Sequence, residues 1–122
     1  MKTTKTILVI EDDEIQRELM SMTLKRRGYS VSTAENGIEG YDQAISIPPD
    51  LIVTDINMPG ADGIHVVRRV RDTPELAATR ILVTTGYGTG MAAFSMAEGA
   101  DGYEPKPLNP DSLLASVERL LA

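Results

Sequence analysis

The sequence predicts an α/β fold in which a doubly wound sheet of five parallel strands is covered by helices on both faces. Short apolar runs at 7–10, 51–53 and 81–83 are continuous rather than alternating, which is typical of strands buried on both faces. Segments with helical periodicity lie between these runs, and a strict alternation of strand and helix favours right-handed crossovers in one parallel sheet. The 122 residues suit a single domain over 1–122.

In the first half of the chain, a helix is expected after the first apolar run. Its apolar residues recur at helical spacing, and Gly28 is a stop signal; these residues are Ile15, Leu19 and Met22. A weaker strand is expected over 29–34. A helix follows over 40–47, and the pair Pro48 and Pro49 ends it.

In the second half, a helix marked by Ile64, Val67 and Val70 ends before Pro74. Another is expected over 91–97, with a short fifth strand near 102–104. The last helix has the clearest apolar stripe, with Asn109 as its N-cap and Pro110 at its first position; the stripe consists of Leu113, Leu114, Val117, Leu120 and Leu121.

Composition excludes several classes of function. The net charge of −6 argues against a nucleic-acid binder and against docking on anionic membranes. The absence of cysteine excludes disulfides, thiolate nucleophiles and cysteine zinc sites, and the single histidine, His65, excludes a histidine-rich metal site. No apolar run approaches the roughly 20 residues of a membrane span, and no signal peptide is evident. We therefore expect a soluble, cytoplasmic protein.

Polar residues follow the predicted strands where a parallel sheet binds its ligands, outside the carboxyl ends of the strands. They are Glu11, Asp12 and Asp13 after the first run, Asp55 after the third strand, Thr84 and Thr85 after the fourth, and Lys106 after the fifth. Clustered acids repel one another, and Mg²⁺ relieves such repulsion by binding carboxylate and phosphate oxygens. A carboxylate can then attack phosphorus, while a lysine and a hydroxyl neutralise the phosphoryl oxygens.

Each residue also has an ordinary structural interpretation. Acids before a helix complement its dipole, an aspartate after a strand caps a turn, and a lysine is usually a surface charge. His65 has no neighbouring ligand and is expected at the surface or in packing. Gly86, Gly88 and Gly90 fail the dinucleotide-binding pattern and suggest a mobile loop. Four polar residue types at four strand ends nevertheless favour a functional site.

The motifs resemble the receiver domain of two-component response regulators, of the single-domain, chemotaxis-regulator-like kind. The resemblance covers the whole chain and rests on residues 7–12, 52–60, 84–86 and 99–103 and on the Lys106-Pro107 pair. It implies a flavodoxin-like sheet with strand order 2-1-3-4-5.

The resemblance also implies the roles of the metal-site residues. Asp55 corresponds to the phosphoacceptor and contributes to the metal site. Asp12 corresponds to the direct metal ligand and Glu11 to the acid that holds the metal through water. Asn57 offers its backbone carbonyl. The metal is Mg²⁺, with Mn²⁺ as an alternative, and Asp13 is left outside the site.

Further roles concern the switch and its partners. Thr85, rather than Thr84, corresponds to the switch hydroxyl, Lys106 to the phosphate-pairing lysine and Tyr103 to the switch aromatic. The expected phosphodonor is a sensor histidine kinase or a histidine phosphotransfer protein. The output is a change in the face formed by the fourth helix, fifth strand and fifth helix. That face would control an unknown downstream protein or a fused effector domain.

Two alternatives and two departures from the family pattern remain. A Mg²⁺-dependent phosphatase of the haloacid dehalogenase-like type would also form an aspartyl-phosphate, but its nucleophile usually follows the first strand. The second alternative is a receiver-shaped interaction domain that is never phosphorylated.

Pro105 stiffens the end of the fifth strand, and Leu108 stands where the family often has phenylalanine. A receiver would not be an enzyme beyond catalysing its own phosphorylation and dephosphorylation.

Overall fold

The computed structural model describes residues 4–56, 63–86 and 88–122, without the side chains of residues 88 and 89. Its strands are β1 (Thr6–Ile10), β2 (Ser30–Ala34), β3 (Leu51–Asp55), β4 (Arg80–Thr85) and β5 (Gly102–Pro105). Its helices are α1 (Glu14–Arg26), α2 (Gly37–Ser46), α3 (Gly63–Arg71), α4 (Gly88–Ala97) and α5 (Pro110–Leu121), with a short 3₁₀ helix at Pro74–Leu76. No helix in these ranges is long and apolar enough to cross a membrane.

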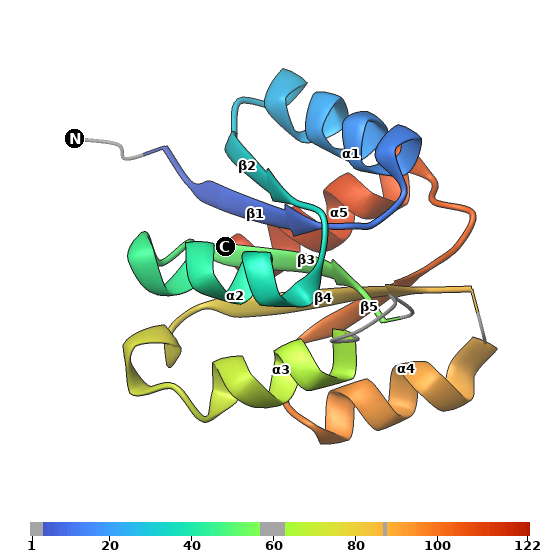
Figure 1. Ribbon diagram of the computed structural model, residues 1–122. Helices are drawn as coiled ribbons and strands as arrows, with labels where there is room; N and C mark the ends of the chain where they lie inside the picture. Colours follow the sequence, from blue (N-terminus) through green and yellow to red (C-terminus); the bar gives the residue numbers. More distant parts are fainter. Residues whose placement is uncertain (1–3, 57–62, 87) are drawn as a thin grey trace.

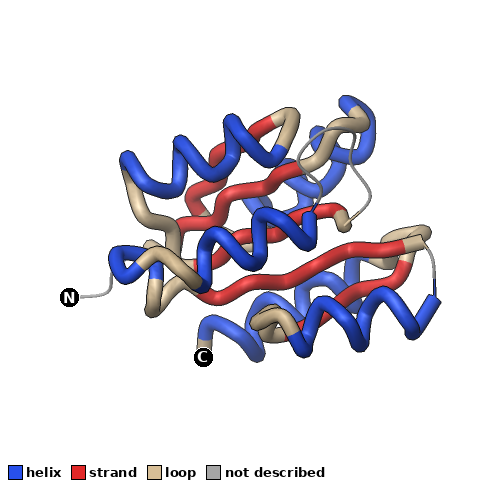
Figure 2. The backbone as a smooth tube through the Cα atoms, turned by 60° about the horizontal axis from the view of Figure 1, so that its bottom comes forward, coloured by secondary structure: helices blue, strands red, loops and turns tan. Residues whose placement is uncertain are grey.

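The five strands form one parallel sheet in the order β2-β1-β3-β4-β5. This confirms the predicted fold class and strand order. Helices α1 and α5 cover one face, and α2, α3 and α4 cover the other (Figures 1 and 2). The central strand β3 is buried along its whole length, because both of its faces lie under helices.

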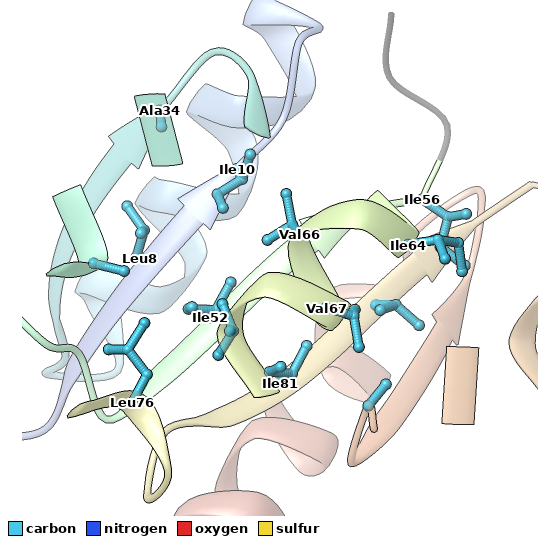
Figure 3. Packing of buried hydrophobic residues seen from close by; sticks show 14 residues of the cluster. Leu8, Ile10, Ala34, Ile52, Ile56, Ile64, Val66, Val67, Leu76 and Ile81 are labelled. Carbon is cyan, nitrogen blue, oxygen red and sulfur yellow. The ribbon is translucent and has the colours of Figure 1, made fainter. Parts of the chain in front are cut away.

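Two apolar clusters fill the spaces between sheet and helices. On the α3 side, the side chains of Val66 and Val67 lie over Ile52 and Ile81 of the sheet, and Ile64 lies beside Ile56 (Figure 3). On the other side, α1 and α5 pack onto the alternate residues of the same strands, such as Val9 and Val53. Burial of both strand faces explains why the apolar runs are continuous.

Two helices begin earlier than expected. Helix α2 begins at Gly37 because the Asn36 carboxamide oxygen caps it, accepting a hydrogen bond of 2.8 Å from the Glu39 amide. Helix α4 begins at Gly88, so Gly88 and Gly90 lie in its first turn. The predicted loop is therefore wrong at Gly88 and Gly90, which are helical, whereas Gly86 precedes the helix.

The apolar residues whose spacing predicted α1 face solvent. Ile15, Leu19 and Met22 are 72%, 59% and 46% exposed, whereas Met20 and Leu24 are buried against the sheet. The spacing therefore predicted the helix correctly, but a different set of residues forms its buried face. As a result, α1 carries an exposed apolar ridge, which we call the α1 ridge (Ile15, Leu19 and Met22).

Gly63 brings the start of α3 into contact with the end of β3. A Cβ atom on Gly63 would lie 2.1 Å from the backbone oxygen of Asp55 and 2.6 Å from the Cα of Ile56. The Gly63 amide donates a 3.0 Å hydrogen bond to the Ile56 carbonyl. Since both obstacles are backbone atoms, no side-chain rotation relieves the clash.

We predict that Gly63→Ala lowers the free energy of unfolding by about 1–3 kcal/mol, the usual cost of overpacking. Gly90→Ala is the matched control, because nothing lies within 4 Å of its added Cβ. That control should raise stability by up to about 1 kcal/mol, since alanine favours helix. Urea unfolding of the three proteins measures both effects. Equal stability of Gly63→Ala and wild type would contradict the close contact.

Candidate functional site

Three carboxylates meet at the carboxyl ends of β1 and β3. One carboxylate oxygen from each of Glu11, Asp12 and Asp55 lies within 4.8 Å of the other two. Glu11 and Asp55 are buried and Asp12 is exposed, so the cluster opens to solvent on one side. The strands bring these acids together because β1 and β3 are neighbours in the sheet, with Ile10 opposite Thr54. We call this group the acidic cluster.

Lys106 reaches the acidic cluster from the end of β5. Its Nζ atom lies 2.9 Å from Oδ2 of Asp55 and 3.0 Å from Oε1 of Glu11. Its backbone amide donates a 2.8 Å hydrogen bond to the Thr85 carbonyl, which ties the lysine to the end of β4. The Lys106–Pro107 peptide bond is cis.

Burial and charge shift two pKa values in the cluster. Burial raises the pKa of Glu11, and the nearby Asp55 carboxylate raises it further, although hydrogen bonds from Asp13 and Lys106 act in the opposite direction. Burial on its own would lower the pKa of Lys106, but hydrogen bonds and charge from Asp55 and Glu11 raise it overall. The lysine is therefore cationic at neutral pH.

The donor set of the acidic cluster fits a hard divalent cation. Three carboxylates face a single ammonium, so the cluster lacks positive charge. All of its donors are oxygens, which Mg²⁺ prefers, and the exposed Asp12 leaves an approach from solvent. Glu11, Asp12 and Asp55 are the described residues able to hold such an ion. Asn57, whose carbonyl was expected to contribute, lies outside the described residues.

Asp13 has a structural task that keeps it out of the acidic cluster. Its carboxylate caps α1 by accepting a 2.9 Å hydrogen bond from the Gln16 amide. Its own amide donates to Oε2 of Glu11 at 3.1 Å. Of the three consecutive acids, the first two face the site, while the third starts the helix.

The predicted switch residues lie around the cluster rather than in it. Thr85 is buried and stands opposite Pro105 in the β4–β5 register. Thr84 is also buried and stands opposite Asp55, so burial alone does not choose between the two threonines. Tyr103 is 43% exposed on β5. His65 is exposed on α3, as expected, and is not part of the acidic cluster.

Two residues near the site were not identified from the sequence. Arg17 of α1 donates a 3.0 Å hydrogen bond from Nη1 to the Glu11 carbonyl, and thereby braces the loop that carries the acids. Glu104 of β5 is buried and accepts hydrogen bonds from the hydroxyls of Ser112 and Ser116 on α5. The spacing of these serines within an apolar stripe is the only feature that could have indicated a buried acceptor.

Residues 7–118 match the family of the response regulator receiver domain. The chain belongs to this family. It is 37% identical over 115 residues to the response regulator MprA of Mycobacterium avium and, likewise, to that of Mycobacterium tuberculosis. These matches cover 94% of the receiver chain but 50% of each MprA protein, so the chain spans half the length of these curated relatives.

Solved structures agree with this assignment. The chemotaxis protein CheY4 of Vibrio cholerae has a TM-score of 0.92 and 33% identity, covering 98% of this chain and 100% of that one. The response regulator TrrA of Thermotoga maritima, solved in complex with Mg²⁺-BeF, has a TM-score of 0.87 and 36% identity, covering 97% and 100%. The protein is thus a receiver domain of two-component systems, which is a signalling domain rather than a classical enzyme. The phosphatase alternative is not favoured.

We predict that Asp12→Ala weakens Mg²⁺ binding by about tenfold or more, because it removes a donor from the acidic cluster. Asp13→Ala is the control for charge, since it removes the adjacent acid. It should lower the free energy of unfolding by about 1 kcal/mol through loss of the cap, with a smaller effect on the metal. Calorimetric Mg²⁺ titration and urea unfolding separate the two effects. Equal losses of affinity would show that the acids have been assigned wrongly.

Proposed function

We propose that the receiver is a phosphorylation-activated switch in a two-component phosphorelay, with Asp55 as its phosphoacceptor. The observation that supports this best is the setting of Asp55. Its carboxylate is buried, lies 2.9 Å from the Lys106 ammonium and shares the acidic cluster with Glu11 and Asp12. A phosphoryl group bound there would meet a cation on one side and a metal-binding set on the other.

The reaction is a transfer between two protein side chains. An Asp55 carboxylate oxygen attacks phosphorus of a phosphohistidine; the new P–O bond forms as the P–N bond breaks, and the imidazole nitrogen keeps the electron pair. The Lys106 ammonium would neutralise one phosphoryl oxygen. Mg²⁺, when bound, supplies charge neutralisation to the other oxygens. We assign its ligands to Asp12, Asp55, the Asn57 carbonyl and, through water, Glu11, with Mn²⁺ as an alternative ion.

The phosphodonor is a sensor histidine kinase or a histidine phosphotransfer protein. Response regulators pair with histidine kinases, and the TrrA relative was solved with Mg²⁺-BeF, a mimic of a phosphoryl group. The α1 ridge is the surface on which we propose that the donor docks. It begins at Ile15, just beyond the acids of the cluster, and continues along α1 through Leu19 and Met22. A donor covering this ridge would bring its histidine to the open side of the acidic cluster.

The face formed by α4, β5 and α5 would change on phosphorylation and pass the signal to a partner. Thr85 lies at the end of β4 beside Lys106, and Tyr103 is the exposed aromatic of β5. After phosphorylation, the Thr85 hydroxyl would bond one phosphoryl oxygen and Tyr103 would turn inward. Phe94 and Met96 of α4 are also exposed. This face would contact a downstream protein or a fused effector domain, without direct contact to nucleic acid or membrane.

We predict that acetyl phosphate with Mg²⁺ adds one phosphoryl group to the wild-type chain and none to Asp55→Asn. The amide of asparagine cannot form the acyl phosphate, although it retains the shape of the side chain. Intact-mass spectrometry under non-acidic conditions measures the addition. Asp50→Asn is the control, since Asp50 directly precedes β3, at the end of the strand opposite to Asp55. A phosphoryl adduct on the Asp55→Asn protein would contradict the assignment.

We also predict that Thr85→Ala still accepts phosphate at Asp55 but shows a weaker conformational response at α4 and Tyr103. The hydroxyl is the group that would bond the phosphoryl oxygen, and without it the two states of the switch differ less in free energy. Amide chemical shifts of α4 and Tyr103, with and without beryllofluoride, measure the transmission. Thr84→Ala, one residue earlier, is the matched control. Wild-type shift changes in Thr85→Ala would show that another group couples phosphorylation to α4 and Tyr103. Loss of the response only in Thr84→Ala would show that Thr84 is that group.

A further inference from the structure

A groove of about 950 Å³ lies between α2 and the β2 edge of the sheet, apart from the acidic cluster. Its floor includes Thr6 and Leu8 of β1 and Ser30 and Ser32 of β2. These four residues share one face of the sheet, because Thr6 pairs with Ser30 and Leu8 with Ser32 in the register. The hollow exists because the two serines on this face are too small to fill the space below α2.

The strand beside the groove, β2, is an edge strand of the sheet. Ser30 donates its amide to the Lys5 carbonyl and Ala34 accepts from the Glu11 amide, so these residues bond toward β1. Backbone groups of alternate residues point to opposite edges, and those of Val31 and Thr33 therefore point outward. The Thr33 carbonyl accepts a 2.9 Å hydrogen bond from Gln43. Within the described residues no strand pairs with this outer edge, so the N–H and C=O of Val31 are open to an added strand.

The rim of the groove combines apolar and acidic side chains. Ile47 is 78% exposed and Ile38 is 59% exposed, which is unusual for large apolar residues at one place. Glu39 and Asp42 lie on the same rim, and the residues of the described part of the chain that line the groove include no lysine or arginine. Among the described residues, neither acid takes part in an ion pair. The groove therefore carries an excess of negative charge and is complementary to a cationic ligand.

We propose that this groove and the outer edge of β2 bind an extended, basic segment of a partner protein as a sixth strand of the sheet. The segment would bond its backbone to Val31. Its alternate side chains would point into the groove. A lysine or arginine at these positions would lay its methylene chain on Ile38 and Ile47 and place its charge beside Glu39 and Asp42. This surface goes beyond phosphotransfer and leaves the acidic cluster free.

The test uses the unphosphorylated, ¹⁵N-labelled chain and a synthetic peptide of about eight residues that alternates valine and lysine, with blocked ends. The control peptide has the same composition, with its lysines in one block. We expect saturable binding of the alternating peptide, with amide shifts centred on Val31, Thr33 and Ile38, and affinity for the block peptide weaker by about tenfold. Failure of the alternating peptide to bind, or equal binding of both peptides, would overturn the proposal.

Charge-reversal variants separate the groove from the general negative charge of the chain. The double variant Glu39→Lys with Asp42→Lys should weaken binding by about tenfold or more. The control double variant, Asp72→Lys with Glu75→Lys, changes the net charge equally at acids outside the groove. Equal losses in both would show non-specific attraction only and would overturn the proposal, as would shifts centred on the acidic cluster.

Val31→Pro tests the edge itself, because it removes the outward N–H without removing a hydrogen bond to β1. We expect weaker peptide binding, with phosphorylation by acetyl phosphate retained as the check that the chain is folded. If the variant does not fold, the charge-reversal pair still decides the result. Peptide binding is measured without phosphorylation. A failure to bind the peptide would therefore not contradict Asp55 as the phosphoacceptor, and a failure of phosphorylation would not contradict peptide binding.

Discussion

The ammonium of Lys106 lies between two carboxylates that the fold has taken out of water, and much of the site depends on this arrangement. Burying Glu11 and Asp55 side by side would be costly if neither had a partner. Lys106 bonds to both, at 3.0 and 2.9 Å, and belongs to a segment far away in sequence. The pairing therefore links β1, β3 and β5 at one end of the sheet.

The same arrangement prepares the site for chemistry. Lysine neutralises only part of the negative charge, and the exposed Asp12 leaves an open side where a cation and a phosphoryl group could enter. Neighbouring contacts hold the acids in position. Arg17 braces the Glu11 carbonyl, Asp13 caps the adjoining helix, and Gly63 allows α3 to begin against the backbone of Asp55. The cluster is thus held by backbone contacts as well as by charge.

The surface around this core is not uniformly polar. The α1 ridge begins at the acidic cluster, whereas Ile38 and Ile47 lie at the groove beside β2. Both surfaces carry large apolar side chains outside the core, so a partner that covered them would gain free energy by removing them from water. They lie on helices of opposite faces of the sheet (Figure 1). Two different partners could therefore contact one small domain.

Sequence by itself determined the strands, the fold class and the residues of the acidic cluster. A continuous apolar run reports burial on both faces, and polar residues after such runs must gather at one edge of a parallel sheet. These are local properties, and Glu11, Asp12, Asp55 and Lys106 could be identified from them and from the family resemblance. The roles of Thr85, Tyr103 and Asn57 rest on the resemblance and stay predictions.

Only the tertiary structure decided which surfaces meet. Helical spacing located α1, but the buried face carries Met20 and Leu24 rather than the more regular stripe, because packing depends on the neighbouring elements and not on the helix alone. The glycines at 88 and 90 belong to α4, although their sequence pattern suggested a loop. Gly63 and Glu104 gained their importance from atoms distant in sequence, Glu104 from serines on α5. Contacts of this kind depend on how the elements pack together. The pattern of residues along one element does not show which distant residues it will contact.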